Sequence, residues 1–249
     1  MKQSHLVITA TFGKEPGALH VVRALGTTFS VYTPGVDSTR VVGSIAAEWR
    51  ELEDLFSPGL PDSEINRLRR GTLAWSEADN RLHSVALACR RLQIDTGGLF
   101  SAWHPGWFDP GDYVSGWAIR SAAAALYACG IPNFCISSDG ETQTAGHGPK
   151  GGWRVSVADP ARPDDPSTLV SLPSPGELAV ATAGGSGASL TVVGDAIDQV
   201  GAIAWAALAA ADGAPQVVRA AGFEAFGRDA AGNSWWTSGM PALATTLPE

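Results

Sequence analysis

The stretch TGGLFSAWHPGWFDPGDYVSGWAI, residues 96–119, joins two segments that the sequence pattern predicts to be helices. In the first segment Gly97 and Gly98 stand where a helix C-terminal cap is expected. The second segment, from about Gly116 to Cys129, is rich in alanine. Apolar residues recur at helical spacing in the first segment, at Leu82, Val85, Ala86, Cys89 and Leu92. The stretch between the helices therefore presents its polar and aromatic residues at the start of a helix.

Elsewhere in the chain, strands and helices are segregated rather than alternating one by one. The pattern predicts strands at 5–12, 27–32, 133–137, 153–158, 178–182, 189–193, 223–226 and 234–237. Further helices are predicted to begin at Ser44, within 62–64 and near Asp195. This order predicts an α+β fold rather than a doubly wound parallel sheet. We expect one domain over residues 1–249, or two lobes that divide near the proline-rich connection 159–175.

Charge and composition exclude several classes of protein. The chain has 17 basic and 25 acidic residues, so it lacks the basic clusters that nucleic acid or an anionic membrane surface requires. The N-terminus has no uninterrupted apolar core of a secretion signal, and the apolar run 197–211 is broken by Asp198. The three cysteines show no metal-ligand spacing. We therefore expect a soluble cytoplasmic protein with reduced thiols.

Two groups of side chains in and around the opening stretch allow more than one interpretation. Nine tryptophans accompany only three tyrosines, and Trp103, Trp107 and Trp117 lie close together, either for packing or to stack on a flat ligand. Carboxylates recur near predicted element ends, where Mg²⁺ beside phosphate would find oxygen ligands. Acidic residues near helix starts are also favoured by the helix dipole alone. The acidic positions are Asp109, Asp112, Asp139, Glu141 and Asp198.

The order of segments resembles the ApbE family, the FAD:protein FMN transferases, from about residue 22 to 240. Each segment is short, and eight of them occur in the family's order. They are Leu25–Ser30, Leu55–Ser57 with Pro61–Leu68, Thr96–Phe100, Phe108–Ile119, Ser138–Glu141, Gly152–Pro160, Ala179–Thr182 and Ser189–Val193. The resemblance implies an α+β fold with antiparallel sheets, several helices and a ligand cleft between two halves.

The resemblance also implies an activity and a set of site residues. The family uses Mg²⁺ to cleave FAD and transfers FMN, through a phosphoester, onto a Thr or Ser of a partner flavoprotein. By position, the cofactor-binding residues would be Leu25, Asp109, Ser115, Asp139 and Glu141. The metal would be held by Asp198 and, through its backbone carbonyl, by Asp112.

The chain departs from the family pattern at several of these places. Gly59 replaces a tyrosine, Ser101 an aspartate, Ser115 a lysine, and Ala202 a threonine that ligates the metal. A family segment that contains an FAD-contacting histidine has no counterpart, because Thr182 runs through a glycine-rich stretch directly into the next strand. The resemblance therefore implies a shortened and diverged member. Such a member is a transferase, a protein that binds a flavin or another flat metabolite without transfer, or an enzyme with a new role for Asp112, Asp139 and Glu141.

Overall fold

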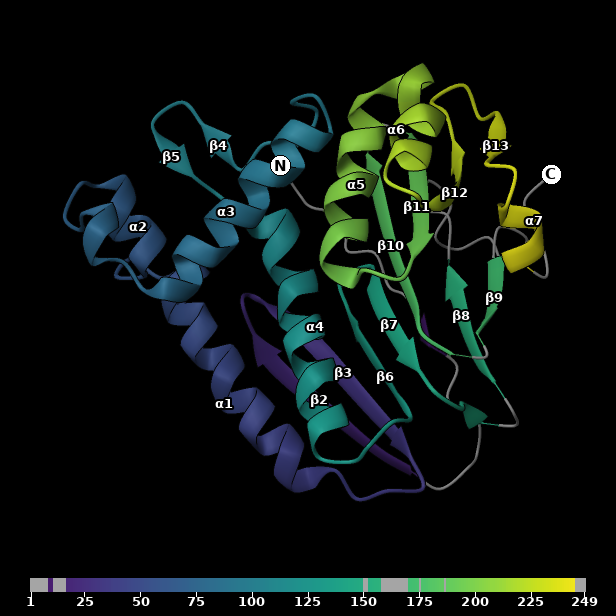
Figure 1. Cartoon of the computed structure of the whole chain (residues 1–249), viewed down its shortest axis with the longest axis horizontal. Coiled ribbons are helices and arrows are strands. Elements are labelled where there is room, and N and C mark those ends of the chain that lie inside the picture. The colour runs from purple at the N-terminus through teal and green to yellow at the C-terminus, as the bar shows by residue number, and fades with distance from the viewer. Residues whose placement is uncertain are drawn as a thin grey trace.

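An eight-stranded antiparallel sheet runs through the middle of the molecule in the computed structural model (Figure 1). The structure describes residues 9–10, 17–149, 152–157, 170–174, 176–185 and 187–244. The strand order is β13-β12-β11-β10-β7-β6-β3-β2. These strands are β2 (Gly17–Ala24), β3 (Thr27–Pro34), β6 (Phe134–Ser138), β7 (Glu141–Ala145), β10 (Leu178–Gly185), β11 (Ala188–Gly194), β12 (Glu224–Arg228) and β13 (Ser234–Trp236). The pairing of β7 with β10 joins the earlier and later parts of the chain in one sheet.

Helices pack on one face of this sheet (Figure 1). They are α1 (Thr39–Phe56), α4 (Gly111–Ala128), α5 (Ile197–Ala209) and α6 (Ala214–Ala220), with the short η4 (Ala211–Gly213) between the last two. Trp49 of α1 is fully buried and its ring stacks on Phe29 of β3, with 4.2 Å between ring centroids. Its Nε1 donates to the carbonyl of Ala118 in α4 at 3.2 Å. One indole thus connects α1 to both the sheet and α4.

A smaller sheet, in the order β1-β8-β9, has its own apolar core with the large sheet. Its strands are β1 (Thr9–Ala10), β8 (Trp153–Val157) and β9 (Val170–Ser174), and α7 (Met240–Leu243) lies beside them. Val155 and Val157 of β8 pack with Val180 of β10 and Val193 of β11. Neighbouring residues Ala179, Ala181 and Val192 belong instead to the core beneath the helices. This alternation is the strand period of two, with both faces of the central strands buried.

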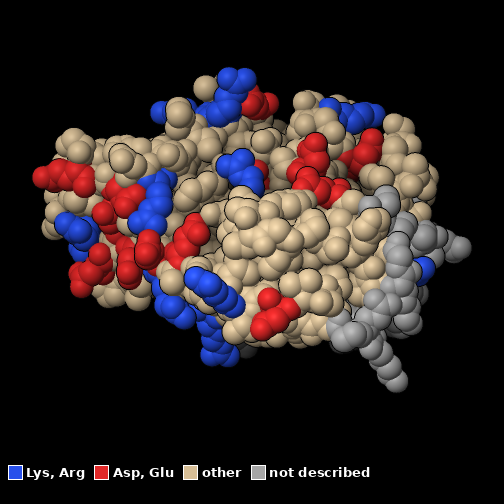
Figure 2. All heavy atoms as spheres, turned by 60° about the horizontal axis from the view of Figure 1, so that its bottom comes forward, with Lys and Arg blue, Asp and Glu red and all other residues tan. Residues whose placement is uncertain are grey.

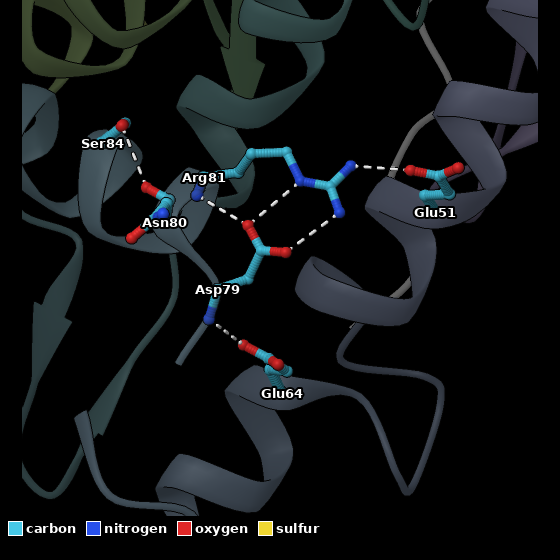
Figure 3. Close-up of polar contacts among 6 residues, drawn as sticks. All are labelled: Glu51, Glu64, Asp79, Asn80, Arg81 and Ser84. Carbon is cyan, nitrogen blue, oxygen red and sulfur yellow. Dashed lines mark hydrogen bonds and ion pairs between the residues drawn. The ribbon is translucent and has the colours of Figure 1, made fainter. Parts of the chain in front are cut away.

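A polar network connects the helices at the left of Figure 1. They are α1, α2 (Glu64–Arg69) and α3 (Asn80–Asp95), with η1 (Trp75–Glu77) between α2 and α3. Arg81 lies between Asp79 and Glu51 in Figure 3, with ion pairs of 3.1 Å and 2.9 Å. Asp79 also caps α3 by accepting from the backbone N–H of Arg81 at 2.7 Å, and its own N–H donates to Glu64 at 2.9 Å. Arg81 holds the pKa of Asp79 below its ordinary value through these hydrogen bonds.

The predicted α+β fold is confirmed, and several predicted ends are confirmed with it. Helix α1 ends at Phe56 with Ser57 as its C-cap, and Gly97 and Gly98 follow α3 with positive φ, as expected for a C-terminal cap. Strands β12 and β13 form the predicted closing hairpin. Most of the strand predicted at 5–12 lies outside the described residues, of which β1 covers Thr9–Ala10.

Four expectations about individual elements are wrong. Helix α1 begins at Thr39 after Ser38, not after Ser44, and α4 begins at Gly111 rather than near Gly116. Consequently Asp112 lies inside the first turn of α4 rather than before it. Strand β2 was not predicted, and β9 lies within the expected connection 159–175.

The surface of the described residues agrees with the charge pattern of the sequence. Figure 2 shows acidic and basic side chains interspersed on the left of one face, with a broad uncharged area in its middle. Within the part of the chain that the structure describes, no helix is long and apolar enough to cross a membrane. Cys89, Cys129 and Cys135 are free thiols.

Candidate functional site

The crossing of α4 and α5 brings the candidate site together, and a glycine permits it. A Cβ on Gly116 of α4 would lie 2.4 Å from the carbonyl oxygen of Ile197 and 2.9 Å from the Cα of Asp198. Real Cβ atoms do not approach backbone this closely, so only glycine allows the two helices to touch here. The start of α5, with Asp198 in its first turn, therefore lies directly against the first half of α4.

Asp198 is the most deeply placed carboxylate of the site, with 4% of its side chain exposed. Its Oδ2 accepts from the Tyr113 hydroxyl at 3.0 Å and pairs with Arg120 Nη1 at 3.1 Å. Its Oδ1 is buried and has no hydrogen-bond partner among the described residues. Burial, and then the charge of Asp198, raises the pKa of Tyr113, so this hydroxyl stays a donor. A buried carboxylate oxygen without a donor is the kind of atom that a cation or a water satisfies.

Glu141, the first residue of β7, reaches the same crossing from the sheet. Its Oε2 accepts from the Ser115 hydroxyl at 2.5 Å, and its Oε1 lies against Gly201 of α5. The carbonyl oxygen of Asp112 borders the same space, 3.3 Å from where a Gly201 Cβ would be. Burial raises the pKa of Glu141 to about 8 against the effect of Ser115, and nearby carboxylates add to the rise. At neutral pH this carboxyl is therefore mostly protonated.

The two aspartates at the start of α4 differ in their surroundings. Asp109 lies just before the helix and its Oδ1 accepts from the backbone N–H of Gly111 at 3.1 Å. Asp112 lies in the first turn, where the helix dipole favours a carboxylate. Even so, loss of hydration raises its pKa, and the charge of Asp109 raises it further. Negative charge therefore accumulates at this end of α4, which favours a positively charged group nearby.

Two tight turns of the sheet line a pocket of about 470 Å³. Gly26 comes from the β2–β3 turn and Asp139 from the β6–β7 turn, and the Thr27 and Ser138 hydroxyls connect the turns at 3.2 Å. The full lining is Arg23, Ala24, Gly26, Thr27, Thr28, Glu53 and Asp139. Leu25 belongs to the same turn as Gly26 but is not part of the lining, because its side chain is partly buried against the core. The pocket and the α4–α5 crossing are connected through Asp139 and Glu141, whose charges interact.

An aromatic hairpin precedes Asp109 in the chain. It consists of β4 (Trp103–His104) and β5 (Trp107–Phe108). Arg90 lies 4.8 Å from the Trp103 ring centroid and Arg69 lies 4.7 Å from that of Trp107, both in cation–π geometry. The sequence left two roles open for Trp103 and Trp107, packing or stacking on a ligand. The structure shows a third arrangement, because each of these two rings already has an arginine on it.

The structure brings four of the predicted site residues together and separates the others into two nearby groups. Asp112, Ser115, Glu141 and Asp198 meet at the helix crossing. Asp139 lies at the pocket beside the turn that contains Leu25, and Asp109 lies at the start of α4. Tyr113 and Arg120 also belong to this group, and neither was predicted from the sequence. Their spacing offered a signal, because Tyr113, Gly116 and Arg120 fall at i, i+3 and i+7 on one helical face.

The chemistry of the donor set fits a magnesium ion that keeps most of its water. In the described ranges, no three or more His, Cys, Asp and Glu side chains are grouped as a metal site. The oxygens available at the crossing are Asp198 Oδ1 and the Asp112 carbonyl, with the mostly protonated Glu141 carboxyl beside them. Ala202, one turn after Asp198, adds none. Mg²⁺ commonly binds one or two carboxylates and completes its shell with water and substrate phosphates, so this reduced set is adequate.

Comparisons with known proteins agree with this fold. The model of the ApbE family matches residues 106–226. The flavin transferase ApbE of Vibrio cholerae superposes with a TM-score of 0.74 at 17% identity, over 92% of this chain and 100% of that one. For the ApbE protein of Thermotoga maritima the TM-score is 0.79 at 15% identity, over 93% and 100% of the chains. A search of curated proteins gave no match. The fold is that of the solved flavin transferases, and residues 106–226 of the chain match the ApbE family.

Proposed function

We propose that the protein is a flavin transferase that moves FMN from FAD to a Thr or Ser hydroxyl of a partner flavoprotein, with Mg²⁺. The observation that carries this proposal is the convergence of Asp198, the Asp112 carbonyl and Glu141 at the α4–α5 crossing, next to the pocket. The match to the ApbE family supplies the reaction class, because phosphoryl transfer depends mainly on positioning and on charge neutralisation.

In this reaction the acceptor hydroxyl oxygen forms a bond to the FMN phosphorus. The bond from that phosphorus to the bridging pyrophosphate oxygen breaks, AMP leaves, and the hydroxyl proton is released. Bound Mg²⁺ would neutralise charge on the pyrophosphate oxygens. We propose that Asp198 Oδ1 and the Asp112 carbonyl would hold it, which the unpartnered state of Oδ1 supports.

The remaining side chains of the site organise these groups. The Tyr113 hydroxyl donates to Asp198 Oδ2, and Oδ1 has no hydrogen-bond partner among the described residues. Ser115 fixes Glu141 by donating to Oε2, so that Oε1 faces α5. The pocket beside Asp139 is of the size that small-molecule sites have. We propose that part of the flavin nucleotide occupies this pocket.

We also propose a cytoplasmic location, which the three free thiols support.

The test is transfer to a defined acceptor. The protein is incubated with FAD, Mg²⁺ and an acceptor flavoprotein that the Vibrio cholerae transferase modifies, and the acceptor is analysed by intact mass and in-gel flavin fluorescence. We expect covalent FMN on the acceptor, its loss with EDTA, and its loss in Asp198→Asn. Binding of FAD with no transfer, while the Vibrio cholerae enzyme modifies the same acceptor, would contradict the proposal and identify a flavin-binding protein instead.

A further inference from the structure

The ion pair between Arg120 and Asp198 joins a buried charge to an exposed one. Asp198 has 4% of its side chain exposed, whereas 56% of the Arg120 side chain is exposed. A buried carboxylate is costly unless a positive charge or several donors compensate it. Among the described residues, Arg120 is the basic side chain that pairs with Asp198, and the Tyr113 hydroxyl is its other donor. The chain therefore brings its own positive charge to this carboxylate.

The two oxygens of Asp198 are used unequally. Oδ2 takes both Tyr113 and Arg120, and Oδ1 takes no described partner. A cation at Oδ1 would lie within a few ångströms of the guanidinium, and like charges at that distance repel strongly in a partly buried site. A divalent cation and Arg120 are therefore in competition for the same carboxylate.

The helix geometry keeps Arg120 in place for this role. Arg120 follows Gly116 by one turn of α4, and Gly116 is the point where α5 touches α4. The contact places the start of α5 next to that turn, while the exposed guanidinium remains free to move away from Asp198. If the guanidinium moves into water, the buried carboxylate loses its counter-charge, and a cation at Asp198 would then have to compensate it.

We propose that Arg120 is a resident counter-charge for Asp198, which compensates the carboxylate when no divalent cation is bound and which a cation must displace in order to bind. The proposal concerns the same site as the proposed function, and its test uses no FAD and no acceptor. A failure of FMN transfer therefore leaves it standing, and its own failure leaves the transferase proposal intact.

The experiment compares wild-type protein with Arg120→Gln. Mg²⁺ is titrated by isothermal calorimetry, and thermal unfolding is followed by circular dichroism with and without Mg²⁺. We expect Arg120→Gln to melt at a lower temperature than wild type without Mg²⁺ and to recover when Mg²⁺ is added. Its affinity for Mg²⁺ should rise on the order of tenfold or more, because a repelling unit charge has been removed next to the site. Wild type should respond weakly to Mg²⁺.

Two further variants control for the loss of charge alone. Arg91→Gln breaks an exposed ion pair with Asp95 in α3 and should leave the Mg²⁺ response as in wild type. Adding Asp198→Asn to Arg120→Gln removes the uncompensated charge, so the double variant should regain stability without Mg²⁺ and lose the tighter binding. Equal Mg²⁺ affinity in wild type and Arg120→Gln would overturn the proposal. If Arg120→Gln folds neither with Mg²⁺ nor with Asp198→Asn added, Arg120 is needed for packing, and the proposal is also overturned.

Discussion

The carboxyl group of Glu141 lies in the space that a side chain on Gly201 would fill. A Cβ at Gly201 would come within 2.2 Å of Glu141 Oε1, so Glu141 keeps this position only while residue 201 has no side chain. The atom in conflict is the end of a flexible side chain rather than backbone. This makes Gly201 a position where the site can be changed with little change to the fold.

Gly201→Ala should therefore displace Glu141 while the protein stays folded. Alanine favours the helix by about 1 kcal/mol over glycine, which offsets part of the repacking cost. We expect a free energy of unfolding within about 1 kcal/mol of wild type. The Glu141 carboxyl should move toward water, and its pKa should fall from about 8 toward its ordinary value of 4.5. Urea unfolding and a ¹³C NMR titration of the carboxyl measure the two effects. An unchanged pKa would show that Glu141 does not occupy this space.

Gly116→Ala, unlike Gly201→Ala, should lower the free energy of unfolding. Its new Cβ would meet the backbone of Ile197 and Asp198, which cannot rotate away, so α4 and α5 must separate. Overpacking of this kind costs about 1–3 kcal/mol or more, and it exceeds the gain from helix propensity. Urea unfolding measures the loss, with Gly201→Ala as the matched control. A Gly116→Ala protein as stable as wild type would mean that the helices do not touch here.

The raised pKa of Glu141 predicts how stability depends on pH. The unfolded chain loses this proton near pH 4.5, whereas the folded protein keeps it to about pH 8. Between these values the folded state binds more protons, so the free energy of unfolding falls as pH rises, by about 1.4 kcal/mol per pH unit from this group. Glu141→Gln should remove this slope. Urea unfolding at intervals from pH 5 to pH 8 checks it, with Glu77→Gln, an exposed carboxylate in η1, as the control.

Ser115→Ala should raise the pKa of Glu141 further. The Ser115 hydroxyl donates to Oε2 at 2.5 Å and is the group that lowers this pKa against burial and the neighbouring carboxylates. Removing the donor leaves the ionised form with less stabilisation. A ¹³C NMR titration should give a midpoint above that of wild type. A lower midpoint would mean that water replaces the hydroxyl and that the Glu141 carboxyl is less buried than in the structure.

Asp79 should matter for stability through both its cap and its charge. Asp79→Ala removes the side-chain cap of α3 and the partner of Arg81, and should cost about 1–2 kcal/mol. Asp79→Asn keeps a capping oxygen and should cost less. Because the folded pKa of Asp79 lies below its ordinary 3.8, its contribution is present above that pH and is lost as the pH falls through the folded pKa. Thermal unfolding at pH 7 and at pH 3 separates the two variants.

Elements with clear end signals were predictable from the sequence, and elements that depend on distant contacts were not. Gly97 and Gly98 predict the end of α3, because glycine adopts the positive φ of a helix C-terminal cap. Both residues have positive φ, so this prediction is confirmed. Strand β2 lies at the edge of the sheet, and its burial alternates along the strand. Apolar Leu19 and Val21 lie on its exposed side, so its sequence lacks the apolar–polar alternation that predicts a half-buried strand. Strand β9 contains Pro173, which argues against a strand but is tolerated at an edge, as here.

In the candidate site, too, features that depend on distant contacts were not predictable from the sequence. The position of Asp112 was misjudged because Gly111 and Gly116 are poor helix formers, and packing against α5 outweighs that preference. Asp112, Glu141 and Asp198 were candidates as acidic residues near element ends and through the resemblance to a family, whereas Ser115 was a candidate through the resemblance alone. The spacing of Arg120 placed it on the same helical face as Tyr113 and Gly116, but its pairing with Asp198 was not predictable, because that pairing depends on how closely two helices approach.

The β2–β3 turn has a consequence for laboratory evolution of this protein. Leu25 and Gly26 both have positive φ, at +54° and +74°, a pattern in which asparagine, aspartate or glycine is preferred at the first position. A leucine held in this conformation costs about 1–2 kcal/mol. A screen for heat-resistant variants would therefore select Leu25→Asn early. Since the turn borders the pocket, survivors of such a screen should be sorted by ligand affinity, and those that gain stability while losing affinity would map the surface that the ligand uses.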